Sequence, residues 1–82
     1  MAKPALHMNG TSQADLFNQY LNAVLAIEAA IDAVGQAAPH GRDYYTQALE
    51  DWQEAREEHE GTLIDLERMR ARYTALARHC MP

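Results

Sequence analysis

The segment that decides the fold is residues 17–38, FNQYLNAVLAIEAAIDAVGQAA. Its apolar residues recur at alternating intervals of three and four, which is typical of an amphipathic helix packed along one seam. Ser12 precedes the pattern as a candidate N-cap, and Pro39-His40-Gly41 follows it as a stop signal. The sequence therefore predicts a helix over 12–38. The seam positions are Phe17, Tyr20, Val24, Ile27, Ile31, Val34 and Ala38.

A second and longer pattern of the same kind covers the rest of the chain. It predicts a turn at 39–42 and a helix over 43–80, with Asp43 as its cap or first-turn anion. Strand-type alternation is missing from the sequence. We expect an all-α fold: a flexible tail over 1–11, then one helical-hairpin domain over 12–82 with coiled-coil-like seams. The second seam consists of Tyr45, Ala48, Trp52, Ala55, His59, Thr62, Leu66, Met69, Tyr73, Leu76 and Cys80.

Gly61 and Thr62 leave two interpretations of the second helix open. Glycine inside a helix costs about 1 kcal/mol, and Thr62 with Asp65 has the spacing of a new helix cap. A break at Gly61 would give three helices. The seam nevertheless keeps its phase across Gly61, which favours one continuous helix, either straight or bent.

The small size of the chain calls for an additional source of stability. A chain of 82 residues buries only about 60% of its unfolded surface. Its single cysteine, Cys80, excludes an internal disulfide and is expected to be a reduced thiol, with an intermolecular bridge as the alternative. Association with another chain is the remaining source of stability.

The two predicted helices differ in length, which bears on the same question. At 1.5 Å per residue, about 26 residues span about 39 Å and about 38 residues span about 57 Å. We therefore expect part of the second helix, carrying Met69, Tyr73, Leu76 and Cys80, to extend past the first helix. Apolar surface of this kind favours contact with another chain.

The charges of the second helix suggest how two copies would associate. Acidic residues dominate 43–60, whereas 61–80 carries four arginines against Asp65 and Glu67. Two antiparallel copies would place acidic half against basic half. The alternative is a solvated helix whose charges suit its dipole. We favour an antiparallel homodimer, a four-helix bundle. The predicted dimer-interface residues are Trp52, Leu66, Met69, Tyr73 and Leu76.

Catalytic, cofactor and metal sites are not predicted. No base stands beside a nucleophile, and the Glu-x-x-His pattern of di-iron bundles is missing. His59 in the second seam is interpreted as a polar register residue rather than a ligand or pH switch. The formal net charge of −5 argues against nucleic-acid binding. Without a signal peptide or an apolar span, we expect a cytoplasmic protein with no membrane contact.

A candidate surface for another protein lies outside the predicted hairpin core. Tyr44 and Ile64 are not needed by that core, and the acidic residues nearby form a charged patch. The alternative, for each of these residues taken singly, is an ordinary exposed side chain that contacts no partner. The candidate partner-binding residues are Tyr44, Glu50, Glu54, Glu57, Glu58 and Ile64.

The segments 40–47, HGRDYYTQ, and 55–59, AREEH, resemble small uncharacterised helical proteins of tailed phages and prophages of proteobacteria. Many of those proteins carry Gly-Pro where this chain has Ala48-Leu49, which leaves the second helix starting near Asp43 or near Ala48. The resemblance implies a phage-encoded accessory protein that acts inside a bacterial host cell. It implies no activity.

These observations together favour a non-enzymatic, homodimeric interaction module that binds and modulates a host or phage protein. One alternative is a structural or assembly component whose role is self-association. A second alternative is a nucleic-acid-associated protein that uses the arginines at 68, 70, 72 and 78.

Overall fold

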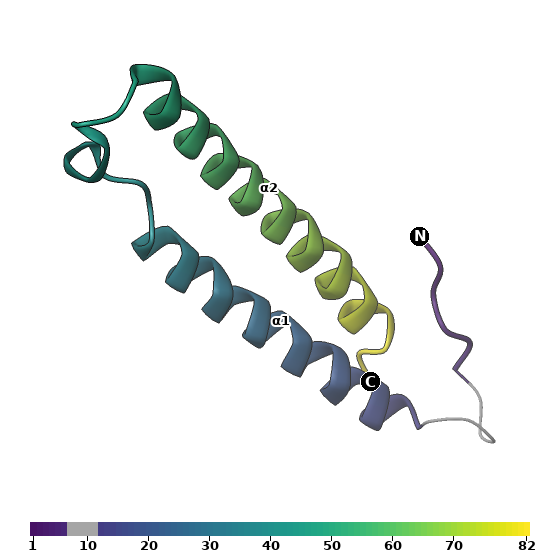
Figure 1. Cartoon of the computed structure of the whole chain (residues 1–82). Coiled ribbons are helices and arrows are strands. Elements are labelled where there is room, and N and C mark those ends of the chain that lie inside the picture. The colour runs from purple at the N-terminus through teal and green to yellow at the C-terminus, as the bar shows by residue number, and fades with distance from the viewer. Residues whose placement is uncertain (7–11) are drawn as a thin grey trace.

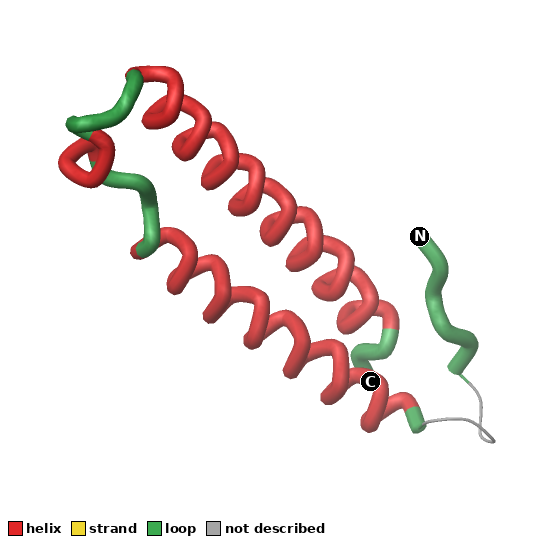
Figure 2. Tube along the Cα trace, in the orientation of Figure 1, coloured by secondary structure: helices red, strands yellow, loops and turns green. Residues whose placement is uncertain are grey.

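The chain folds as a single helical hairpin (Figures 1 and 2). The computed structural model describes residues 1–6 and 12–82. Two helices, α1 (Gln13–Gln36) and α2 (Leu49–His79), pack against each other and are joined through a short 3₁₀ helix, η1 (Gly41–Tyr44). The described residues contain no strand. The predicted all-α hairpin is therefore confirmed, while part of the predicted tail, 7–11, lies outside the described residues.

α1 begins where the sequence places its cap. The Ser12 side chain accepts a hydrogen bond of 3.1 Å from the backbone N–H of Asp15, which satisfies one of the free donors of the first turn. The helix ends at Gln36, three residues before Pro39, because a proline there could not donate to the helix. α1 is thus slightly shorter than the predicted 12–38.

α2 begins at Leu49 rather than at Asp43. The connection instead forms η1 and a turn, and Ala48 is extended with φ −64° and ψ 149°. This course brings the Tyr44 and Trp52 rings to 5.8 Å between centroids. In a continuous helix, residues eight positions apart would be separated by about 12 Å along the axis. The ring contact therefore requires the chain to leave the helical path.

α2 runs through Gly61 without interruption, so the continuous interpretation is confirmed. A Cβ built at Gly61 would meet nothing within 4 Å, and its φ is not positive. The position thus requires neither the conformational freedom of glycine nor its small size.

Replacing Gly61 with alanine should raise the free energy of unfolding by about 1 kcal/mol, because glycine is the poorer helix former. Thermal unfolding followed by circular dichroism measures the change. Gly41→Ala is the control, since Gly41 lies in η1 rather than in a long helix. A Gly61→Ala variant less stable than wild type would contradict the open environment seen at this position.

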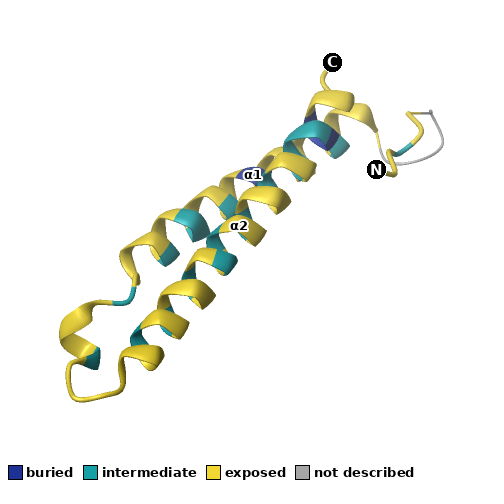
Figure 3. Ribbon diagram, turned by 90° about the horizontal axis from the view of Figure 1, so that it is seen from above, coloured by how far each residue is buried: buried dark blue, intermediate teal, exposed yellow. Residues whose placement is uncertain are grey.

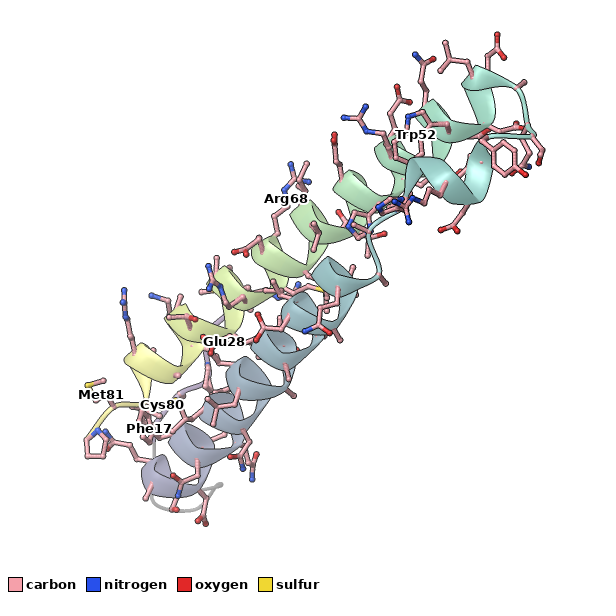
Figure 4. The ribbon with its side chains drawn as sticks, turned by 90° about the vertical axis from the view of Figure 1, so that its left-hand side faces the viewer. Phe17, Glu28, Trp52, Arg68, Cys80 and Met81 are labelled. Atoms are coloured by element: carbon pink, nitrogen blue, oxygen red, sulfur yellow. The ribbon has the colours of Figure 1, made fainter. Side chains whose placement is uncertain are left out.

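Packing between the two helices is concentrated at the end that holds the chain termini (Figure 3). The buried apolar residues are Val24, Leu76, Ala77 and Cys80, of which Cys80 is fully buried. Figure 4 places Phe17 beside Cys80 at this end, with Trp52 at the opposite end. Side chains toward the connection are half-buried or exposed, so the core is narrow and one-sided.

The prediction that the C-terminal part of α2 extends past α1 is wrong. The Tyr73 ring packs against the Tyr20 ring in a tilted arrangement, with 6.1 Å between ring centroids, and Gln13 Nε2 donates to the Met81 carbonyl at 3.1 Å. The C-terminal end of α2 therefore lies beside the start of α1. α2 has 31 residues and α1 has 24, which leaves about 10 Å of extra helix at the connection. The unmatched segment is the acidic one.

The face that α2 turns toward α1 also differs from the predicted seam. Leu63 is half-buried and Ala77 is buried, whereas Thr62 and Met69 are exposed. A straight helix has 3.6 residues per turn, so it drifts about 20° per heptad away from a strict 3-4 repeat. The drift moves positions 63, 70 and 77 toward α1 in place of 62 and 69.

Truncating Leu76 to alanine should lower the free energy of unfolding by about 2–4 kcal/mol, because its side chain is 8% exposed and its removal leaves a cavity. The same truncation at Ile64, which is 52% exposed, should change stability by less than about 1 kcal/mol. Chemical denaturation of both variants measures the difference. Equal effects would contradict the placement of the core at the terminal end.

Candidate interaction surface

The end of the hairpin that holds the connection forms the candidate surface. We call it the acidic tip: η1, the connection as far as Ala48, and residues 49–60 of α2. Trp52 lies at its centre. The Tyr44 ring packs 5.8 Å from the Trp52 ring, and the Arg56 guanidinium carbon lies 5.5 Å from the Trp52 ring centroid. Both distances suit attractive contacts with an aromatic ring.

Large apolar side chains at the acidic tip face solvent. Tyr45 is 84% exposed and Leu49 is 64% exposed. They border an open hollow of about 310 Å³. Apolar groups this exposed contribute nothing to the hairpin core, so they are free to contact another molecule. The hollow is lined by Gly41, Tyr44, Tyr45, Gln47, Leu49 and Trp52.

The acidic side chains of the tip follow the outer side of α2. Because α2 is continuous, spacings of four, three and seven residues place Glu50, Glu54, Glu57 and Ile64 on one stripe. All four are exposed. Glu58 lies beside this stripe, one turn after Glu54. The structure thus brings five of the six predicted partner-binding residues onto neighbouring positions.

Tyr44 is the exception among the predicted partner-binding residues. It is half-buried against Trp52, which lies on the opposite side of α2 from the acidic stripe. Tyr45 and Leu49 were missed as surface residues. Tyr45 was assigned to the predicted seam and so was not considered for the surface. Leu49 could have been found from the sequence, because it is a large apolar residue that lies outside that seam.

The predicted dimer-interface residues are distributed differently. Leu66 and Tyr73 are half-buried, and Leu76 is buried within the single chain. Trp52 is half-buried near Tyr44. Met69 is 39% exposed, and of the five it presents the most open side chain. Leu76 packs inside the hairpin and is not exposed to a second copy.

The arginines of α2 do not form one patch. Arg68 and Arg72 lie one turn apart on one side of α2, whereas Arg70 and Arg78 line the hollow on another side. Arg70 is paired with Glu67, with 2.6 Å between Nη2 and Oε2. Arg72 lies over Tyr73, with its guanidinium carbon 5.2 Å from the ring centroid. A phosphate backbone needs cations gathered on one side, and this arrangement does not provide them.

The N-terminal residues lie against the basic end of α2. Lys3 lines an open hollow of about 760 Å³ together with Glu28, Arg70 and Arg78. The His79 Nε2 atom is 2.9 Å from the Pro4 carbonyl oxygen, a hydrogen-bond distance. Acidic and basic side chains are mixed in this hollow, so it does not select one sign of charge.

Two further properties concern the described part of the chain. Residues 1–6 and 12–82 contain no group of three or more histidine, cysteine, aspartate or glutamate side chains placed to hold a metal ion. None of their helices combines the length and the apolar character that crossing a membrane requires.

Comparison with known proteins identified no relative. No family model matches the chain, and no curated protein or solved structure matches it either. The resemblance of segments 40–47 and 55–59 to phage proteins therefore stays a prediction.

Removing the Tyr44 ring should expose Trp52 and shift its fluorescence emission to longer wavelength. Trp52 is the single tryptophan of the sequence, so the signal reports on the acidic tip alone. Tyr45→Ala is the matched control, because the neighbouring Tyr45 side chain is 84% exposed. Identical emission from the Tyr44→Ala variant and wild type would contradict the packing of Tyr44 on Trp52.

Proposed function

We propose that this chain is a small non-enzymatic interaction module that binds another protein through its acidic tip. The observation that carries the proposal is the extension of α2 past α1 at this end. It leaves Leu49 64% exposed and Tyr45 84% exposed at the same end of the hairpin as the acidic stripe. A partner would bury these apolar groups and meet the carboxylates with basic side chains.

The proposed module acts as a homodimer, a four-helix bundle of two hairpins. The chain has a radius of gyration of 18.2 Å, against about 12 Å for a compact domain of this length. On α2, Met69 beside the helix–helix contact is 39% exposed. An apolar side chain left open at this position is available for packing against a second copy.

The biological setting of the proposed module is a bacterial cell. The turn segment 40–47 supports a phage-encoded accessory protein that acts on a host or phage protein. Binding would modulate the partner by covering part of its surface, because the residues brought together at the tip offer contact area and charge rather than a reactive group.

Reversing the charge of the acidic stripe should abolish partner binding. The test variant carries Glu54→Lys, Glu57→Lys and Glu58→Lys. Wild type and variant are immobilised and exposed to lysate of a bacterial host, and captured proteins are quantified by mass spectrometry. We expect a protein captured by wild type to fall at least about tenfold with the variant, since each reversal turns attraction into repulsion.

The matched control carries three lysines on the outer side of α1, away from Ala23 and Ala30: Asn18→Lys, Asn22→Lys and Ala29→Lys. These positions are exposed and lie on a different helix from the acidic stripe. The control should capture the same protein as wild type. Equal capture by all three proteins, or no specific capture by wild type, would contradict the proposal.

A further inference from the structure

The two long edges of the hairpin, where α1 and α2 meet solvent side by side, differ in charge. One edge brings Glu28 and Asp32 of α1 to Arg70 of α2, which together with Ile31 line an open hollow. Lys3 of the N-terminal segment lies on the same side, near Glu28 and Arg70. We call this the Glu28 edge. Covering it with another chain would displace water from several charges, which is costly.

The opposite edge is poor in charge on α1. Ala23 and Ala30, seven residues apart, lie across the helix–helix contact from Glu28. The charged residues of α1 are Asp15, Glu28 and Asp32; Glu28 and Asp32 lie on the Glu28 edge, and Asp15 lies in the first turn of the helix, two turns before Ala23. On α2 the same edge carries Met69, which is 39% exposed. We call it the Met69 edge.

Opposite charges flank Met69 along α2. Asp65 and Arg72 are exposed and are seven residues apart, so they lie on one line of the helix beside Met69. The distance between them along the axis is about 10.5 Å, too long for an ion pair within one chain. The contact of the Arg72 guanidinium with the Tyr73 ring, 5.2 Å away, directs this cation toward the helix–helix contact.

We propose that a second copy of this chain packs on the Met69 edge in antiparallel orientation, centred near Met69. A two-fold axis at Met69 brings Asp65 of each copy opposite Arg72 of the other, so two ion pairs flank an apolar centre. The small side chains of Ala23 and Ala30 allow the helices to approach closely. This inference rests on the proposed self-association and assigns its face and register.

The surface area of the chain fits such a partner. The whole chain, including the residues before α1, exposes 6122 Å², whereas a compact monomer of 9.2 kDa exposes about 4,900 Å². A standard protein interface covers about 800 Å² on each partner. The excess of about 1,200 Å² is therefore enough for an interface with one further copy. In this register residues 59–79 of the two α2 helices lie side by side, and residues 49–58 of each copy extend past the end of the partner's α2.

A charge exchange between two variants tests the register. Asp65→Lys and Arg72→Glu should each weaken the homodimer about tenfold, because like charges then meet twice across the axis. An equimolar mixture of the two variants should form a heterodimer in which both ion pairs are present. One is the original pair of Asp65 with Arg72, and in the other the two charges have exchanged positions. The double variant should dimerise like wild type. Sedimentation velocity at increasing protein concentration measures all four samples, and circular dichroism checks their helix content.

A second pair of variants tests the face. Met69→Glu should dissociate the dimer, while Leu25→Glu, an exposed apolar residue near Glu28, should leave it intact. Dissociation by Leu25→Glu alone would overturn the inference and assign the interface to the Glu28 edge. A dimer unaffected by the charge reversals would overturn the register but not self-association. A wild-type chain that stays monomeric at all concentrations would overturn both.

Discussion

The contact between α1 and α2 is the constraint on which the whole structure depends. Two helices form a single layer, so each can bury one side against the other and leaves the rest to solvent. Among the described residues, the buried ones are Val24, Leu76, Ala77 and Cys80; Leu76 and Ala77 lie in the last turn of α2, and Cys80 is its C-cap. The position of this contact determines which end of the hairpin is packed and which side chains remain exposed.

The position of the tight contact determines which end of the molecule is free. The start of α1 meets the C-terminal residues where Gln13 donates to the Met81 carbonyl, which aligns the C-terminal end of α2 with the N-terminal end of α1. The additional length of α2 then extends past α1 at the connection. That segment is acidic and carries exposed apolar side chains, whereas the arginine-bearing segment is packed along α1. The two ends consequently differ in charge and also in packing.

Periodicity was sufficient to predict the two helices and their antiparallel packing, because an amphipathic pattern states which side of each helix is apolar. It could not predict the register between them. Register depends on the course of the connection, and the 3₁₀ turn that places Tyr44 on Trp52 shortens α2 from its predicted start at Asp43 to Leu49. The strict 3-4 repeat also misplaced Thr62 and Met69, since a straight helix follows 3.6 residues per turn. The acidic stripe was predictable because it depends on spacing within one helix.

The uneven packing separates the residues that control stability from those available for binding. Local opening costs least where few apolar side chains are buried, so the acidic tip is the part of the hairpin that opens most easily. A substitution at Leu49 or Glu54 alters the exposed surface while the contact around Cys80 keeps the hairpin closed. A substitution at Leu76 acts on that contact and hence on the whole chain. The tip can therefore vary in sequence, and so in the partner that it fits, without loss of the fold that presents it.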